Sequence, residues 1–202
     1  MLFPFLTIFI AFLLFLAFRY RKISKTSEEQ QAAFWKRELQ ANATPAQDIT
    51  DLPYLTIPLT KFPLDFSEDS VVLDIERQLQ ELSEQKILNL NGVTNTELKV
   101  RYGVPNLNTM TEIGERYNQL TLLLMDYADA LLEADRRIDA ITVLEYGVVI
   151  KSDISRNYTL LADCYMQQEQ PQRVQYLRDQ VNAMDLPLKS AILRHLDGLL
   201  QK

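Results

Sequence analysis

Between about Leu120 and Pro187 the apolar residues recur with helical spacing, and this pattern predicts two consecutive helical hairpins. The pattern repeats, because five of six apolar positions in the first hairpin are again apolar in the second at one constant offset, without a gap. The first set is Leu124, Tyr127, Ala128, Leu131, Ala140 and Leu144, and the second is Tyr158, Leu161, Ala162, Tyr165, Val174 and Arg178. One hairpin cannot bury its apolar stripe alone, so hairpins of this kind are expected to stack.

The residue sizes within the two hairpins fit this stacking. Ala128, Ala140 and Ala162 are expected where two helices cross most closely, while larger neighbours fill the remaining space. Residues 134–137 and 169–171 are expected to form the turns between the paired helices. A last helix to about Leu200 begins near Pro187, and its apolar stripe beside polar residues is typical of a capping helix.

The chain opens with an uncharged run from Leu2 to Phe18, at the short end for a membrane-spanning helix. Basic residues follow this run and no charged side chain precedes it, so the positive-inside rule places the remainder of the chain in the cytoplasm. These basic residues are Arg19, Arg21, Lys22 and Lys25. The rival interpretation is a cleaved signal peptide, but neither a basic leader nor a small-residue cleavage site accompanies the run. An uncleaved anchor is therefore expected.

The segment after the anchor has two parts. Residues 26–40 predict an amphipathic or polar helix in which Phe34 and Trp35 either dock on lipid headgroups or pack on the helical domain. Residues 41–66 contain four prolines, at 45, 53, 58 and 63, and the part at 52–66 also contains eight large apolar residues. Proline disfavours helix, and the apolar content is too high for a disordered linker. An extended strap lying on the helical domain is predicted, either with a packing role alone or guarding a binding surface.

Capping signals predict the helices that follow the strap. Ser67 is the expected N-cap of a helix to about Leu88, Thr94 caps a short helix that ends at Gly103, and Thr109 caps a long one. The fold class is therefore all-α. The expected parts are an anchor at 1–19, a juxtamembrane helix with the Pro-containing strap at 20–66, and a helical domain at 67–202, with repeats at about 121–154 and 155–187 and a capping helix at 188–201.

The repeat period, with its small and large positions, resembles that of the tetratricopeptide-repeat family, at about 34 residues, over the C-terminal part of the chain. The chain departs from that pattern at Ser152, Val174 and Arg178, and a plain helical bundle remains the alternative. The resemblance implies a concave partner-binding surface lined by the first helix of each hairpin. It would comprise Leu122, Met125, Asp129, Leu132, Glu133, Arg156, Thr159, Asp163, Met166 and Gln167.

Composition and motifs limit the chemistry of the chain. The net charge of −6 and the absence of a dense basic patch beyond the juxtamembrane segment argue against nucleic-acid binding. No glycine-rich phosphate loop occurs, and Cys164 and His195 are the only residues of their kinds. A cysteine–histidine nucleophile pair is formally available but nothing in the sequence supports it. We therefore expect no enzymatic activity, no cofactor and no metal site. Asp126, Asp129 and Glu133 are interpreted as an acidic helix face.

Two functions fit this organisation. The first is a membrane-anchored cytoplasmic adaptor that binds a protein partner through a tetratricopeptide-like surface. Because that surface carries Asp129 and Asp163, a chaperone's acidic tail is disfavoured, and a basic or amphipathic segment suits it better. The second is a structural subunit of a membrane, envelope or secretion assembly, in which the apolar span is itself an interface.

Overall fold

The computed structural model describes residues 3–201, without the side chains of residues 3–7, 11, 14, 17, 18 and 20–27. Every regular element in this range is a helix, so the all-α prediction is confirmed. Contacts group the chain into two units, one built from residues up to Ile49 with Val93–Asn108 and the other from Thr50–Gly92 with the residues from Thr109 onward. The predicted helical domain at 67–202 therefore differs from the observed grouping, which assigns 93–108 to the first unit.

The first unit contains the long N-terminal helix α1 (Phe3–Asn42), the short helix α3 (Asn95–Tyr102) and the 3₁₀ turn η2 (Val104–Asn106). Glu38 of α1 accepts hydrogen bonds from Lys99 and from the hydroxyl of Thr96, at 2.6 Å for the latter. This contact with Lys99 holds the pKa of the Glu38 carboxyl below its usual range. Phe34 and Trp35 are 54% and 55% exposed, so neither side chain is buried against α3.

The predicted membrane span from Leu2 to Phe18 falls mostly on positions that lie outside the described side chains, and Leu2 lies outside the described residues altogether. No helix in the described part of the chain combines the length and the apolar character needed to cross a membrane. The backbone from Phe3 to Asn42 forms one continuous helix, so the residues after the apolar run share α1 with it.

Helix α3 is bounded by the two signals that predicted it. The Thr94 hydroxyl accepts from the backbone N–H of Glu97, and the Glu97 carboxylate accepts from that of Thr94, which completes a capping box. Gly103 ends the helix with φ +86°, and a Cβ placed there would lie 2.1 Å from the Pro45 carbonyl oxygen. Both the backbone angle and this close approach require glycine.

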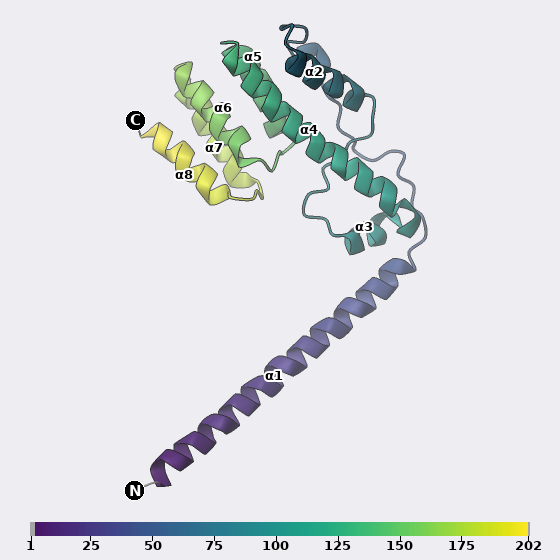
Figure 1. Ribbon diagram of the computed structural model, residues 1–202, viewed down its shortest axis with the longest axis vertical. Helices are drawn as coiled ribbons and strands as arrows, with labels where there is room; N and C mark the ends of the chain where they lie inside the picture. The colour runs from purple at the N-terminus through teal and green to yellow at the C-terminus, as the bar shows by residue number, and fades with distance from the viewer. Residues whose placement is uncertain (1–2, 202) are drawn as a thin grey trace. The chain divides into compact units, whose positions relative to one another are not determined.

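The second unit contains α2 (Ser70–Ser83), most of α4 (Leu107–Glu133), and the helices α5 (Arg137–Val149), α6 (Ser155–Gln167), α7 (Pro171–Ala183) and α8 (Lys189–Leu200). Helices α6, α7 and α8 lie side by side in Figure 1, and α5 also packs on α6. Their apolar side chains form one continuous core with those of α2 and α4. Ala128, Ala140 and Ala162 are fully buried within it, as their predicted crossing positions require.

The crossing of α5 and α6 is especially close at Gly147. A Cβ there would lie 2.2 Å from the side-chain oxygen of Asn157, whose amide donates to the Leu144 carbonyl at 3.0 Å. Because Asn157 is only 1% exposed, this hydrogen bond satisfies a polar group that would otherwise be costly to bury. The pair fixes the approach of the two helices.

The turns after α4 and α6 repeat one geometry, at the offset that relates Ala128 to Ala162. Asp135 and Glu169 both have φ +56°, and the helices that follow begin at Arg137 and Pro171. The N–H of the residue after each acidic residue donates to a carbonyl near the end of the preceding helix, from Arg136 to Leu131 at 2.8 Å and from Gln170 to Tyr165 at 2.9 Å. Helices α5 and α7 each contain 13 residues. The backbone therefore repeats although the turn sequences differ.

The strap packs on the helices of the second unit, as predicted. Ile57 and Phe62 are buried in the core, and the backbone N–H of Leu55 donates to the Ile87 carbonyl at 2.8 Å. The hydroxyl of Tyr146, on α5, donates to the Thr56 carbonyl at 3.0 Å. One 3₁₀ turn, η1 (Leu59–Lys61), interrupts the extended course of the strap.

Three predicted helix boundaries are wrong. Helix α2 begins after Asp69, whose carboxylate accepts from the Val71 N–H at 2.7 Å, whereas the Ser67 hydroxyl accepts from Asp69 outside the helix. It ends at Ser83 and not near Leu88. Helix α4 begins at Leu107, directly after η2, so Thr109 lies inside it and does not cap it. At both helix starts a nearby competing signal determines the boundary.

Candidate partner-binding surface

The ten residues predicted to line a partner-binding surface lie on α4 and α6, but they are not equally accessible. Leu122 is 60% exposed, and Glu133, Arg156 and Gln167 are also exposed. Asp129, Leu132, Thr159, Asp163 and Met166 are half-buried. Met125 is only 5% exposed, so its assignment to the open surface is wrong. It lies on the buried helical stripe formed by Thr121, Leu124, Met125 and Ala128.

One ion pair and one hydrogen-bond contact to a histidine tie the acidic residues of this surface to neighbouring helices. Asp129 of α4 accepts two hydrogen bonds from the Arg156 guanidinium of α6, at 2.5 and 2.7 Å. Asp163 of α6 lies 2.9 Å from the imidazole of His195 on α8. Asp129 raises the pKa of the Arg156 guanidinium, chiefly through its hydrogen bonds, and Asp126 adds a smaller effect in the same direction. Asp129 and Asp163 consequently join helices of the stack and are not free acidic groups.

A groove of about 420 Å³ lies beside this surface, between α2 and α4. Its α2 wall follows one helical face, at positions i, i+3, i+4 and i+7. The lining residues are Val71, Asp74, Ile75 and Gln78 from α2, with Leu123, Asp126, Asp129, Ala130 and Glu133 from α4. Two of the predicted surface residues, Asp129 and Glu133, therefore border a groove whose other wall the sequence analysis missed.

The groove is acidic, because four of its lining residues carry carboxylates and none carries a basic group. Asp74 and Asp129 are engaged by arginines that approach from outside the lining. Asp126 and Glu133 are exposed, and neither forms an ion pair within the described part of the chain. The groove therefore presents two carboxylates without a salt-bridge partner beside apolar surface from Val71.

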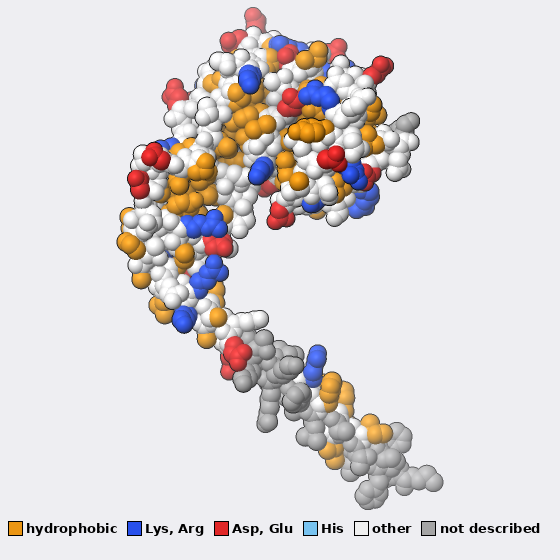
Figure 2. Space-filling model, turned by 180° about the vertical axis from the view of Figure 1, so that it is seen from behind, with side chains coloured by type: hydrophobic (Ala, Val, Ile, Leu, Met, Phe, Trp, Pro, Cys, Tyr) orange, Lys and Arg blue, Asp and Glu red, His pale blue; other side chains and the backbone are white. Residues whose placement is uncertain are grey.

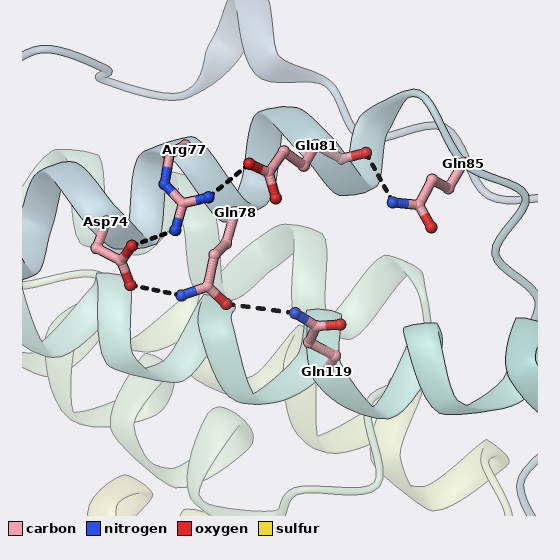
Figure 3. Close-up of polar contacts among 6 residues, drawn as sticks. All are labelled: Asp74, Arg77, Gln78, Glu81, Gln85 and Gln119. Carbon is pink, nitrogen blue, oxygen red and sulfur yellow. Dashed lines mark hydrogen bonds and ion pairs between the residues drawn. The ribbon is translucent and has the colours of Figure 1, made fainter.

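A network of polar side chains stiffens the rim of the groove (Figure 3). Arg77 bridges Asp74 and Glu81 along α2, with donor–acceptor distances of 2.5 Å to each. Gln78 donates to Asp74 at 2.7 Å and accepts from Gln119 of α4 at 3.3 Å. The hydrogen bond from Arg77 holds the pKa of the Asp74 carboxyl below its usual range. The network thereby fixes the side chains of Asp74 and Gln78 on the α2 wall.

A buried carboxylate anchors α2 at its inner side. Glu76 is 3% exposed and accepts from the hydroxyl of Tyr127 at 2.9 Å and from the backbone N–H of Asp65 at 3.0 Å. One side chain thus links α2, α4 and the end of the strap. Burial raises the pKa of the Tyr127 phenol, and the nearby Glu76 carboxylate acts in the same direction. The hydroxyl therefore remains protonated and available as a donor.

The cysteine and the histidine do not form a reactive pair. Cys164 is 2% exposed in the core, and burial raises the pKa of its thiol, which disfavours the nucleophilic thiolate. The His195 imidazole is directed to Asp163 at the surface. Over the described residues no group of three or more histidine, cysteine, aspartate or glutamate side chains is arranged to hold a metal ion.

A second hollow on the second unit has a more apolar lining than the groove. A slot of about 210 Å³ between α5 and α7 is lined largely by apolar residues, and its charged residues Glu145 and Arg173 pair with each other. Val149 and Tyr176 beside it are 74% and 66% exposed. Figure 2 shows apolar side chains gathered in patches among charged ones on the face in view. Because the charges of the slot are paired, it does not select a partner by charge.

The chain was compared with protein-family models, with curated proteins and with solved structures. No family model matches the chain, and neither a curated protein nor a solved structure is significantly similar to it.

Proposed function

We propose that the chain is a membrane-anchored adaptor that binds a protein partner through the surface formed by α2, α4 and α6. The observation that carries the proposal is the pair of helical hairpins in a regular repeat, with matching turns and fully buried alanines. Stacked hairpins of this tetratricopeptide-like kind present extended surfaces for binding. The described residues also contain charged and apolar groups at that surface that the stack leaves exposed.

Anchoring is the second element of the proposal. The uncharged run from Leu2 to Phe18 precedes four basic residues, which favours an anchor with the helical units in the cytoplasm. Tethering to a membrane raises the local concentration of a binding surface without adding any contact. Protease protection tests this part, since the C-terminal helices should resist digestion in intact cells and be cleaved in inverted vesicles. Digestion in intact cells would contradict it.

A site-specific cross-link tests the adaptor function. A photo-reactive amino acid replaces Leu122, which is 60% exposed on α4, in the full chain expressed in its own cells. The matched control carries the same group at Val149, which is 74% exposed on α5. A discrete cross-linked protein is expected from position 122 and not from 149. If neither position yields a cross-linked protein, the adaptor proposal fails.

The alternative function, a structural subunit of a membrane assembly, is favoured by a different observation. Phe34, Trp35 and Leu39 leave large apolar surfaces exposed on α1, at 54%, 55% and 70%. Phe34 and Trp35 also pack edge to face, with ring centroids 5.5 Å apart. Exposed aromatic groups are common at protein interfaces. In that case α1 itself would be the interface, and cross-links would form at position 35 and not at position 122.

A further inference from the structure

We propose that the groove between α2 and α4 binds a basic amphipathic helix of the partner protein. This inference rests on the adaptor function and specifies where and how the partner binds. It differs from the surface implied by sequence, because α2 supplies one complete wall of the site.

The apolar component of the groove comes from both helices. Val71 is 66% exposed although it stands at the start of an otherwise well-packed helix, and Ile75, Leu123 and Ala130 continue the apolar surface inward. Val71 lies outside the buried stripe of α2, which is formed by Val72, Ile75, Leu79 and Leu82. The exposed part of the Val71 side chain therefore does not pack within the second unit. A ligand with an apolar face would cover it.

The negative charge of the groove favours a partner helix that carries basic residues. Asp126 and Glu133 flank the groove on α4 and form no ion pair with the side chains that the structure describes. They lie seven residues apart, which is about 10 Å along a helix. Lysine or arginine side chains at similar spacing on a partner helix would face both carboxylates. Opposite charges steer association and fix register, and their effect weakens as salt increases. A neutral or acidic segment would leave both carboxylates without a partner.

The walls of the groove favour a helical ligand over an extended one. Both walls are α-helices, so neither offers a strand edge to an extended peptide. The one amide side chain in the lining, Gln78, is engaged with Asp74 and Gln119. A helix satisfies its own backbone and needs only an apolar stripe and flanking charges from the groove.

A second copy of this chain is a poor occupant. In a symmetric pair the same patch would lie on both sides of the contact, so the carboxylates of one groove would face those of the other. Like charges that face each other across an interface disfavour association. The net charge of −6 adds to this repulsion. A basic helix from a different protein is therefore the occupant that the charges select.

The test uses a fluorescently labelled, alanine-rich peptide of about 14 residues, or four helical turns. It carries a leucine stripe flanked by lysines, and its matched control replaces every lysine with glutamate. Binding to the full chain in mild detergent is followed by fluorescence anisotropy at low and high salt. The lysine peptide is expected to bind, more weakly at high salt, and the glutamate peptide is not.

Two double variants and one single variant locate the binding site. Asp126→Lys with Glu133→Lys should weaken binding of the lysine peptide about tenfold or more, equivalent to about 1.4 kcal/mol. Glu115→Lys with Asp185→Lys makes the same change in net charge at exposed positions outside the groove, and should alter binding less than twofold. Val71→Ser provides an independent test of the apolar surface and should also weaken binding. All these positions are exposed, and circular dichroism confirms that each variant folds.

The outcomes separate the two proposals. If both double variants weaken binding equally, the peptide senses only net charge and the groove proposal is overturned. If the lysine peptide does not bind at all, the groove proposal also fails, while a partner cross-linked at position 122 would leave the adaptor function standing. Self-association of the full chain that Asp126→Lys with Glu133→Lys abolishes would identify a second copy as the occupant and overturn the proposal.

Discussion

The two ends of the helical stack are covered in different ways. At the C-terminal end one helix, α8, places Ile192 and Leu196 in the core and joins α7 through an ion pair between Arg178 and Asp197. At the N-terminal end the strap and α2 share this role, and they are held to α4 and α5 by the tyrosine hydroxyls of residues 127 and 146. One end is thus closed by a single amphipathic element and the other by two separate segments.

This difference determines where a binding site can form. Helix α8 buries Ile192 and Leu196 of its apolar stripe against the stack. Two segments that meet over α4 leave a groove between α2 and α4, with exposed Val71 and unpaired Asp126 and Glu133 at its edges. The N-terminal end should therefore be both the more sensitive to loss of packing and the one that binds.

The largest expected effect is at the strap. Phe62 is 6% exposed and its ring packs against those of Tyr127 and Tyr146, at centroid distances of 6.5 and 5.7 Å. Phe62→Ala should lower the free energy of unfolding by about 3–5 kcal/mol, because it leaves a cavity in the core. Urea denaturation of the full chain measures this loss. Thr60→Ala, at an exposed position of the same strap, should change it by less than about 0.5 kcal/mol.

The difference between the two ends of the stack would be refuted if the strap contributed nothing to the free energy of unfolding. An unchanged urea midpoint for Phe62→Ala would show that the N-terminal end does not depend on the strap. Leu196→Ala, at the fully buried position on α8, supplies the matching measurement at the other end, with an expected loss of about 2–5 kcal/mol.

The next largest loss of stability is expected at Glu76, whose carboxylate is buried. Glu76→Ala removes the acceptor of the Asp65 N–H and one of the two acceptors beside the Tyr127 hydroxyl, so the free energy of unfolding should fall by about 1–3 kcal/mol. Glu81→Ala on the same helix removes an exposed carboxylate that pairs with Arg77, and should cost less than about 1 kcal/mol. Chemical denaturation distinguishes the two. Equal losses would mean that Glu76 does not join the strap, α2 and α4.

The repeat itself is tested at adjacent positions of α6. Ala162→Leu should destabilise by about 1–3 kcal/mol, because Ala162 is fully buried at a helix crossing and a larger side chain overpacks it. Asp163→Leu should cost less, since Asp163 is half-exposed and loses only its contact with His195. Thermal or urea melts of the two variants decide this. Equal effects would contradict the register of the repeat.

The buried tyrosines predict a dependence of stability on alkaline pH. Burial raises the pKa of Tyr146 to about 12 and also raises those of Tyr117, Tyr127, Tyr158 and Tyr165. A phenol titrates near pH 10 in an unfolded chain, so above about pH 10 the unfolded state releases protons first. The contribution of these tyrosines to stability should therefore be constant below about pH 10 and fall as the pH rises towards about 12.

Tyrosinate absorbance and circular dichroism at each pH measure this effect together. The buried phenols should ionise only as helix content is lost, and Tyr146→Phe should reduce the slope of stability against pH. Ionisation of all tyrosines near pH 10 with helix content intact would contradict the burial of these side chains.

Much of the fold could be predicted from the pattern of apolar residues. The turns at Asp135 and Glu169 and the burial of Ala162 follow from local spacing that recurs from one hairpin to the next. The boundary of α2 could not, because Ser67 and Asp69 both offer capping oxygens and only the observed backbone bond from Val71 selects Asp69. Likewise Thr109 resembles a cap, but the preceding η2 turn already starts α4 at Leu107.

The candidate site was harder to predict because it depends on which helix faces which. Helical spacing predicted that Met125 and Asp129 lie together on the open partner-binding surface. In the structure Met125 is buried, on the same helical stripe as Leu124 and Ala128. The α2 wall requires contacts between residues far apart in the sequence, as in the bond between Glu76 and Tyr127. One local signal was present, since Val71 is an apolar residue outside the stripe of Val72 and Ile75.

A charge-swap titration tests the central claim most directly. The full chain carrying Asp126→Lys and Glu133→Lys is titrated with the lysine-flanked and glutamate-flanked helical peptides, beside the wild type and the variant Glu115→Lys with Asp185→Lys. The account predicts that the groove variant alone inverts the preference and binds the glutamate peptide better than the lysine peptide. An inversion of the same size in the control variant, or none in the groove variant, would contradict the groove between α2 and α4 as the binding site.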